Sequence, residues 1–196
     1  MNVHKQKYAY AIFLIAILFF TVTGSVSATD TYALDPAHTS VTFKVKHLGV
    51  TNVHGRFNDV SGTIVLDEAN PGNNSVVIRV KTDSVDTANA KRDNHLRSPD
   101  FFDAKTFPVI EFKSTSLKKV NAETYEVRGN VSLHGVTRPL NVSAEMTGAG
   151  KDPWGNYRIG FETAFKVKRT DFGMTKMLQA AGDVVRLSVN VEGIRK

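Results

Sequence analysis

The chain has 196 residues and a formal net charge of +6, with 25 lysines and arginines against 19 acidic residues. It contains no cysteine, which excludes disulfides, thiol catalysis and cysteine-ligated metal sites. The length suffices for one domain with a sizeable core. The positive charge is mild, and lysines alternate with acidic residues along the chain, which is typical of a solvated surface rather than of a nucleic-acid-binding one.

The N-terminal segment has the order of a secretory signal peptide, which we predict over residues 1–28. Two lysines precede an almost wholly apolar run at residues 9–22, and mostly small residues follow at 24–28. Cleavage leaves residues 29–196 as a single domain with a charge of +4, because the two lysines are removed. A retained membrane anchor is the alternative, but the apolar run is shorter than the roughly 20 residues that a spanning helix needs.

Apolar and polar residues alternate along most of the remaining chain. Residues 40–47 (SVTFKVKH) are the first clear case, and residues 187–192 (LSVNVE) are the last. A period of two places alternate side chains on one face of a β-sheet, which gives one apolar and one solvated face. Turn signals and short spacings favour antiparallel neighbours. We predict eight strands, at residues 39–48, 54–66, 74–86, 108–118, 123–134, 138–149, 156–169 and 183–194.

The predicted strands are long, several reaching about ten residues where roughly 5–6 is usual. Long antiparallel strands favour a closed barrel over a sandwich, and closure also removes exposed edges. We therefore predict an all-β fold, an extended eight-stranded antiparallel barrel. Two segments break the alternation, and we expect short helices near residues 88–97 and 172–181. In the second, Met174 and Met177 lie at helical spacing, and Gly182 is the expected stop.

The inner face of this barrel is predicted to be apolar and rich in aromatic residues. Gly129 and Ala144 reduce the side-chain volume inside it. A barrel of eight strands is either just filled by side chains or holds one slender ligand, and the alternation leaves both open. An open lumen would take a long hydrocarbon, because burying each CH₂ group contributes roughly 0.8 kcal/mol. The predicted lumen residues are Phe43, Val45, Ile78, Ile110, Phe112, Val127, Val131, Val142, Met146, Ile159, Phe161, Phe165, Leu187 and Val189.

Short segments in a fixed order point to a family. They lie at residues 35–43, 46–50, 55–57, 92–98, 100–103, 107–108, 129–139 and 169–173. Together they resemble the YceI-like proteins, secreted bacterial lipid-binding barrels of lipocalin-like form, over nearly all of residues 32–195. The resemblance implies a barrel with a tunnel, a periplasmic location, and binding of polyisoprenoids, isoprenoid quinones, fatty acids or fatty amides. It implies no catalytic residues and no cofactor, and it favours an open lumen over a filled one.

Three polar residues are candidates for contact with a ligand head group at the barrel mouth. His47 has inward parity at a strand end, and Arg92 carries a planar guanidinium that suits an anionic group. His95 belongs to the same polar cluster as Arg92. The alternative for Arg92 is an internal ion pair with Asp93 that pins the loop to the barrel. No two histidines have a spacing typical of metal ligands, so we predict no metal site.

The sequence thus predicts an exported carrier for one long apolar ligand, an isoprenoid or acyl lipid. The motifs typical of serine hydrolases, phosphate loops and zinc proteases are missing from the sequence, and we predict no enzyme. An enzyme acting on a lipid head group and a filled barrel with a structural or assembly role are the alternatives. We expect no nucleic-acid partner, and the basic excess permits transient contact with anionic membrane surfaces. The sequence leaves open whether two chains form a homodimer.

Overall fold

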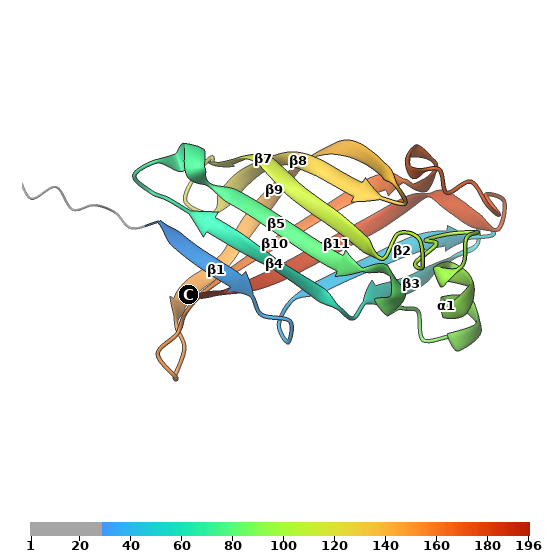
Figure 1. Ribbon diagram of the computed structural model, residues 1–196, viewed down its shortest axis with the longest axis horizontal. Coiled ribbons are helices and arrows are strands. Elements are labelled where there is room, and N and C mark those ends of the chain that lie inside the picture. The colour runs from blue at the N-terminus through green and yellow to red at the C-terminus, as the bar shows by residue number, and fades with distance from the viewer. Residues whose placement is uncertain (1–28) are drawn as a thin grey trace, which may run out of the picture.

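The computed structural model describes residues 29–196, and the predicted signal peptide lies outside them. All strands belong to one antiparallel sheet that closes on itself into an elongated barrel (Figure 1). The strands are β1 (Asp30–Leu34), β2 (Ser40–His47), β3 (Thr51–Phe57), β4 (Val60–Leu66), β5 (Ser75–Lys81), β6 (Val85–Asp86), β7 (Val109–Lys119), β8 (Thr124–Leu133), β9 (Val136–Lys151), β10 (Tyr157–Lys168) and β11 (Ala181–Arg195).

The eleven segments make eight barrel strands, because three of these strands are interrupted. β1 and β2 lie in line on the same neighbour, β11. β3 and β4 then pair with β2 and β1, and β5 and β6 pair with β4 and β3. The predicted eight-stranded antiparallel barrel is therefore confirmed. The segment missing from the prediction is β1, whose five residues are too few to show a clear alternation.

One of the two predicted helices is confirmed. α1 (Ala90–Arg97) begins at Asn89, whose side chain accepts a hydrogen bond from the Arg92 amide at 3.0 Å. Short 3₁₀ turns occur as η1 (Pro71–Asn73), η2 (Thr82–Ser84) and η3 (Arg169–Phe172). In residues 29–196 no helix is both long and apolar enough to cross a membrane.

The prediction of a helix near residues 172–181 was wrong. Gly173, at φ 78°, ends η3 after a single turn, and the chain continues through turns rather than a helix. Met177 adopts a left-handed φ of 54°, which no α-helix contains. Gly182 is not a helix stop, because it already belongs to β11.

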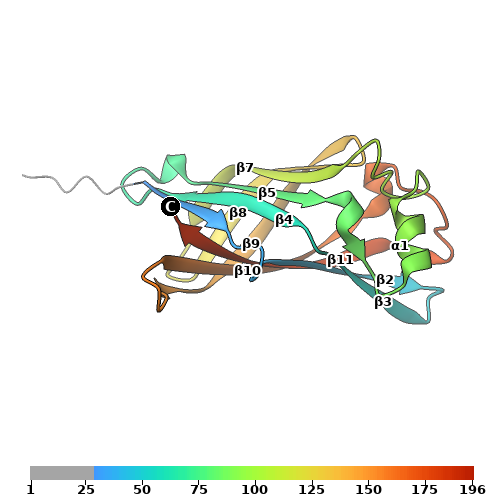
Figure 2. The same cartoon turned by 60° about the horizontal axis from the view of Figure 1, so that its bottom comes forward.

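The packed core fills the end of the barrel that carries β1. Tyr32, Tyr125 and Phe161 are each less than 9% exposed and belong to one cluster. The rings of Tyr125 and Phe161 meet edge to face at 5.2 Å. A second cluster contains Phe57 of β3 and Val85 of β6, and β3 reaches the end of the barrel that carries α1 (Figure 2). Large aromatic side chains thus occupy the barrel toward both ends.

Two phenylalanine rings inside the barrel cover glycines on neighbouring strands. Phe43 lies directly opposite Gly55 in the β2–β3 ladder, and a Cβ atom on Gly55 would collide with its ring. A Cβ on Gly129 would lie 2.6 Å from Cζ of Phe112 and 2.5 Å from the carbonyl oxygen of Lys113. Gly129 therefore makes room for an aromatic ring, rather than simply reducing the side-chain volume as the sequence suggested.

We predict that Gly129→Ala destabilises the barrel by about 1–3 kcal/mol, because the new methyl group overpacks against Phe112 and a backbone carbonyl. The measurement is the urea midpoint of unfolding. Gly148→Ala is the matched control on β9, since a Cβ there meets no atom within 4 Å. Similar midpoints for the two variants would contradict this packing argument.

Candidate ligand-binding cavity

An apolar cavity lies inside the barrel. Its volume is about 260 Å³, and all eight barrel strands contribute side chains to its lining. The atoms that face it are almost all carbon. A site of this composition makes no directed hydrogen bonds, and it gains free energy only by removing apolar surface from water.

Most of the residues predicted to line the lumen do so. Phe43, Val45, Ile78, Ile110, Phe112, Val127, Val131, Val142, Phe161, Phe165, Leu187 and Val189 all border the cavity. Met146 and Ile159 lie outside its lining. Ile159 is 2% exposed and belongs to the packed cluster at the β1 end, against which Met146 also packs. Contact of the lining residues with a ligand remains a prediction.

Several lining residues were not predicted, because they lie outside the long alternating strands. Leu96 of α1, Phe101 and Phe102 border the cavity from the segment that follows β6. Phe172 and Met174 border it from the segment after β10. The available signal was the presence of large apolar residues in otherwise polar connections. It indicates burial, but it does not indicate which part of the barrel they cover.

Arg169 is a buried cation at the edge of the cavity. Its side chain donates to the carbonyl oxygens of Met174 at 2.8 Å, Ala181 at 2.7 Å and Gly182 at 3.2 Å. Burial lowers the pKa of its guanidinium. Because the atoms facing the cavity are almost all carbon, the charged group serves to hold the connection between β10 and β11 and is not offered to a ligand.

Arg92 belongs to a chain of hydrogen bonds that fixes the start of α1. It donates to the Thr87 hydroxyl at 2.7 Å and to the Thr87 carbonyl at 2.8 Å. The Thr87 hydroxyl in turn donates to the buried carboxylate of Asp93. The direct Arg92–Asp93 ion pair considered from the sequence is therefore not formed, because Thr87 bridges the two side chains.

The two candidate histidines also lie away from the cavity. His47 is exposed at the last position of β2. Nε2 of His95 lies 2.9 Å from a carboxylate oxygen of Asp100 on the surface. Neither histidine borders the cavity, and neither does Arg92. Head-group contact by these three residues remains a prediction to which the geometry adds no support.

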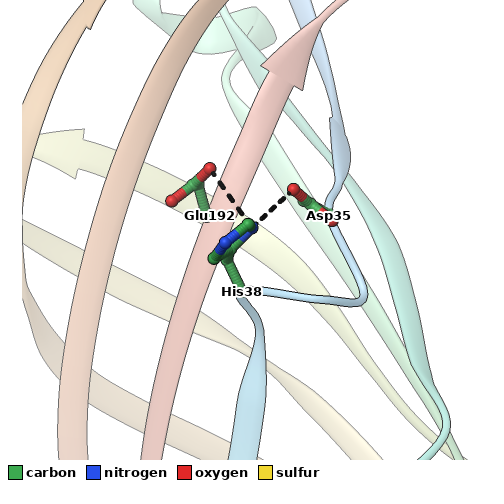
Figure 3. A group of neighbouring side chains, drawn as sticks. All are labelled: Asp35, His38 and Glu192. Carbon is green, nitrogen blue, oxygen red and sulfur yellow. Dashed lines mark hydrogen bonds and ion pairs between the residues drawn. The ribbon is translucent and has the colours of Figure 1, made fainter. Parts of the chain in front are cut away.

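A second polar group gathers outside the barrel, where the strand formed by β1 and β2 is interrupted (Figure 3). Asp35, His38 and Glu192 each have a side-chain atom that could bind a metal, and these atoms all lie within 4.8 Å of one another. Nδ1 of His38 is 2.8 Å from Asp35 and 3.9 Å from Glu192. Imidazole and carboxylate groups are metal ligands in other proteins, so the surroundings of this group decide what it does.

Arg158 forms ion pairs with both carboxylates of this group. Its Nη1 atom pairs with Asp35 at 2.9 Å and with Glu192, and its Nε atom pairs with Asp152 at 2.7 Å. A metal ion would have to displace this guanidinium from two carboxylates at once. We therefore assign the group around Arg158 a structural role, joining the β1–β2 connection to β10 and β11.

The pKa of Asp35 is lowered by its contacts within this group. Hydrogen bonds from His38 and from Arg158 lower it from 3.8 to about 2. Because the pKa is lowered, ionised Asp35 stabilises the fold at pH values above its ordinary pKa of 3.8. This contribution is lost as the pH falls through about 2.

We predict that Asp35→Asn lowers the unfolding temperature most above pH 3.8, and that its difference from the parent protein shrinks as the pH approaches 2. Thermal unfolding followed by circular dichroism between pH 2 and 7 tests this. Glu68→Gln, at an exposed position, is the control and should change little at any pH. A deficit for Asp35→Asn that is constant across the range would contradict the role of the charge.

Comparison with known proteins places the chain in a family. The sequence model of the YceI-like domain matches residues 32–193. A UPF0312 protein of Yersinia enterocolitica is 42% identical over 181 residues, which cover 92% of this chain and 94% of that protein. The match therefore extends over the whole barrel.

Two solved structures share the fold. BcnA of Burkholderia cenocepacia superposes with a TM-score of 0.72 at 20% identity, covering 81% of this chain and 98% of BcnA. A polyisoprenoid-binding domain from Saccharophagus degradans superposes with a TM-score of 0.67 at 16% identity, covering 84% of this chain and 98% of that domain. At these identities the likeness establishes the fold.

Proposed function

The chain belongs to the YceI-like family, and we propose that it is a periplasmic carrier that holds one long apolar lipid inside its barrel. The observation that carries this proposal is the cavity, whose lining atoms are almost all carbon. A cavity of this kind supports a container rather than the filled barrel that the alternation left open. The polyisoprenoid-binding domain of Saccharophagus degradans, which shares the fold, adds support for a lipid ligand.

The lining also bears on the ligand class. A polyisoprenoid, an isoprenoid quinone, a fatty acid and a fatty amide all offer a long hydrocarbon, which this cavity can bury. Each CH₂ group moved out of water contributes roughly 0.8 kcal/mol. A charged or strongly polar head would be costly inside a lining of carbon atoms, so we place the head group beyond the cavity.

The proposed role is transport without catalysis. A hydrocarbon gains little free energy on passing from a bilayer into an apolar lumen, because both surroundings are apolar. The protein would therefore load and unload by transient contact with membranes rather than sequester its ligand. The predicted signal peptide supports export to the compartment where such lipids would otherwise meet water.

We expect lipid to co-purify with the protein when it is isolated gently from the periplasm of its host. Organic extraction followed by mass spectrometry identifies it. A protein that carries no lipid and takes up neither geranylgeraniol nor parinaric acid in solution would refute the proposal.

We predict that Val142→Trp abolishes uptake, because the indole would occupy the cavity that Val142 lines. Fluorescence titration with parinaric acid should show at least a tenfold weaker affinity, with the β-sheet circular dichroism unchanged. Asn141→Trp is the matched control, since the neighbouring side chain on β9 is exposed on the outer face. Equal affinities for the two variants would contradict binding in the lumen.

A further inference from the structure

Two neighbouring turns at the α1 end of the barrel present large apolar side chains to solvent. In the β2–β3 turn, Leu48 is 60% exposed and Val50 is 81% exposed. In the connection before β11, Met177 is 47% exposed and Leu178 is 42% exposed. The two turns touch, because the Leu48 amide donates to the Ala180 carbonyl at 2.9 Å. We call Leu48, Val50, Met177 and Leu178 the apolar rim.

Two residues of the apolar rim also have an unfavourable backbone. Leu48 has a φ of 50° and Met177 a φ of 54°. A left-handed conformation is sterically unfavourable for such residues, and glycine or asparagine adopts it more easily. Folding alone would therefore favour a small polar residue at both positions. Large apolar side chains that combine exposure with backbone strain point to a function on this surface.

A row of cations lies beside the apolar rim. Lys166, Arg186 and Lys44 are directly opposite one another on β10, β11 and β2, which places them side by side on the outer face of the barrel. Lys46 continues the same face of β2 toward the rim. We call these four residues the cationic row. Within residues 29–196, none of the four has a carboxylate at ion-pair distance.

The apolar rim and the cationic row adjoin one end of the cavity. Val45 lines the cavity and lies between Lys44 and Lys46 in sequence. Ala181 also lines it and pairs with His47, the residue before Leu48. Both surfaces therefore belong to the end at which β2, β3 and α1 meet, opposite the end that carries β1 and the C-terminus (Figure 1).

We propose that the apolar rim and the cationic row dock this end of the barrel on an anionic lipid bilayer. The rim residues would enter the head-group region, and the cations would bind lipid phosphates. A hydrocarbon chain could then pass between bilayer and lumen without crossing water. This inference rests on the proposed function, because it supplies the surface at which the carrier exchanges its ligand.

The composition of the surface selects a bilayer over a protein partner. Lysine is depleted in protein–protein interfaces, whereas each Lys or Arg near an anionic membrane raises the affinity about fivefold. Three of the four residues in the cationic row are lysines. Exposed apolar side chains flanked by lysines thus suit a membrane surface, where charged lipid phosphates lie above an apolar interior.

Vesicle flotation tests the docking surface. The purified protein should float with vesicles of phosphatidylcholine that contain phosphatidylglycerol, and it should remain behind with pure phosphatidylcholine. Flotation should weaken in 0.5 M NaCl, since salt screens exposed charges over a few ångströms. Flotation that is absent, or that is equal for both vesicle types, would overturn the proposal.

The cations are tested by Lys44→Gln combined with Arg186→Gln. At about fivefold per cation, vesicle affinity should fall about 25-fold. Lys113→Gln combined with Lys118→Gln removes the same charge from exposed positions on β7 and should leave affinity within about twofold of the parent. An equal loss for the two double variants would show a net-charge effect and would overturn the assignment to this face.

Leu48→Asn separates docking from a structural role. Asparagine tolerates the left-handed backbone, so the unfolding temperature should rise while vesicle affinity falls several-fold. Val120→Asn is the control at the opposite end of the barrel, where Val120 is 63% exposed, and it should not change vesicle affinity. Unchanged affinity in Leu48→Asn would overturn the role of the apolar rim.

Uptake of geranylgeraniol in solution, measured in parallel, separates a failure of the docking surface from a failure of the carrier function. Uptake without flotation would overturn docking and leave the carrier function standing. Flotation without uptake by the parent protein would overturn the carrier function, and the docking surface would then need another purpose.

Discussion

The barrel depends on the pairing of β11 with two separate segments of the N-terminal strand. β2 pairs with the first part of β11 and β1 with its last residues. Between them, residues 35–39 leave the ladder, and this interruption is bridged by the group around Arg158 and by a hydrogen bond from the Asp35 amide to the Glu192 carbonyl at 2.8 Å. With no cysteine in the chain, closure relies on these noncovalent contacts.

Closure turns the two faces of the sheet into the inside and the outside of a barrel. The size of the inward-facing side chains then determines which part of the interior is packed and which part is open. Tyr32, Tyr125 and Phe161 pack together near the β1 end, whereas valines outside this cluster, such as Val45 and Val131, border the open space. Phe43 and Phe112 lie over glycines and line the cavity. The cavity therefore follows from where bulky residues stand along each strand.

The alternation of apolar and polar residues predicted most of this arrangement, because a period of two determines the face of every strand residue once a strand is identified. It placed Val127 and Leu187 on the lining correctly. It did not distinguish the packed position of Ile159 from the open position of Phe165, since that difference depends on neighbours across the barrel. It also carried no information on Leu96 or Met174, whose connections lack the period.

The polar residues were the hardest to assign, because hydrogen-bond partners far apart in sequence decide their roles. Arg158 meets Asp35 across 123 residues, and Arg169 is occupied by backbone carbonyls that no side-chain pattern reveals.

Exchange of a hydrocarbon between two apolar surroundings has little driving force in either direction, so its rate depends on how far the chain must travel through water. A binding protein with a lining of carbon atoms gains little selectivity from the lining itself. In the proposed carrier, selectivity then depends on which surface the end of the barrel with the apolar rim meets. The strained, exposed Leu48 follows Val45 of the cavity lining by three residues. Under the proposed docking this choice is made at the β2–β3 turn, where a small cost in stability accompanies a shorter path through water.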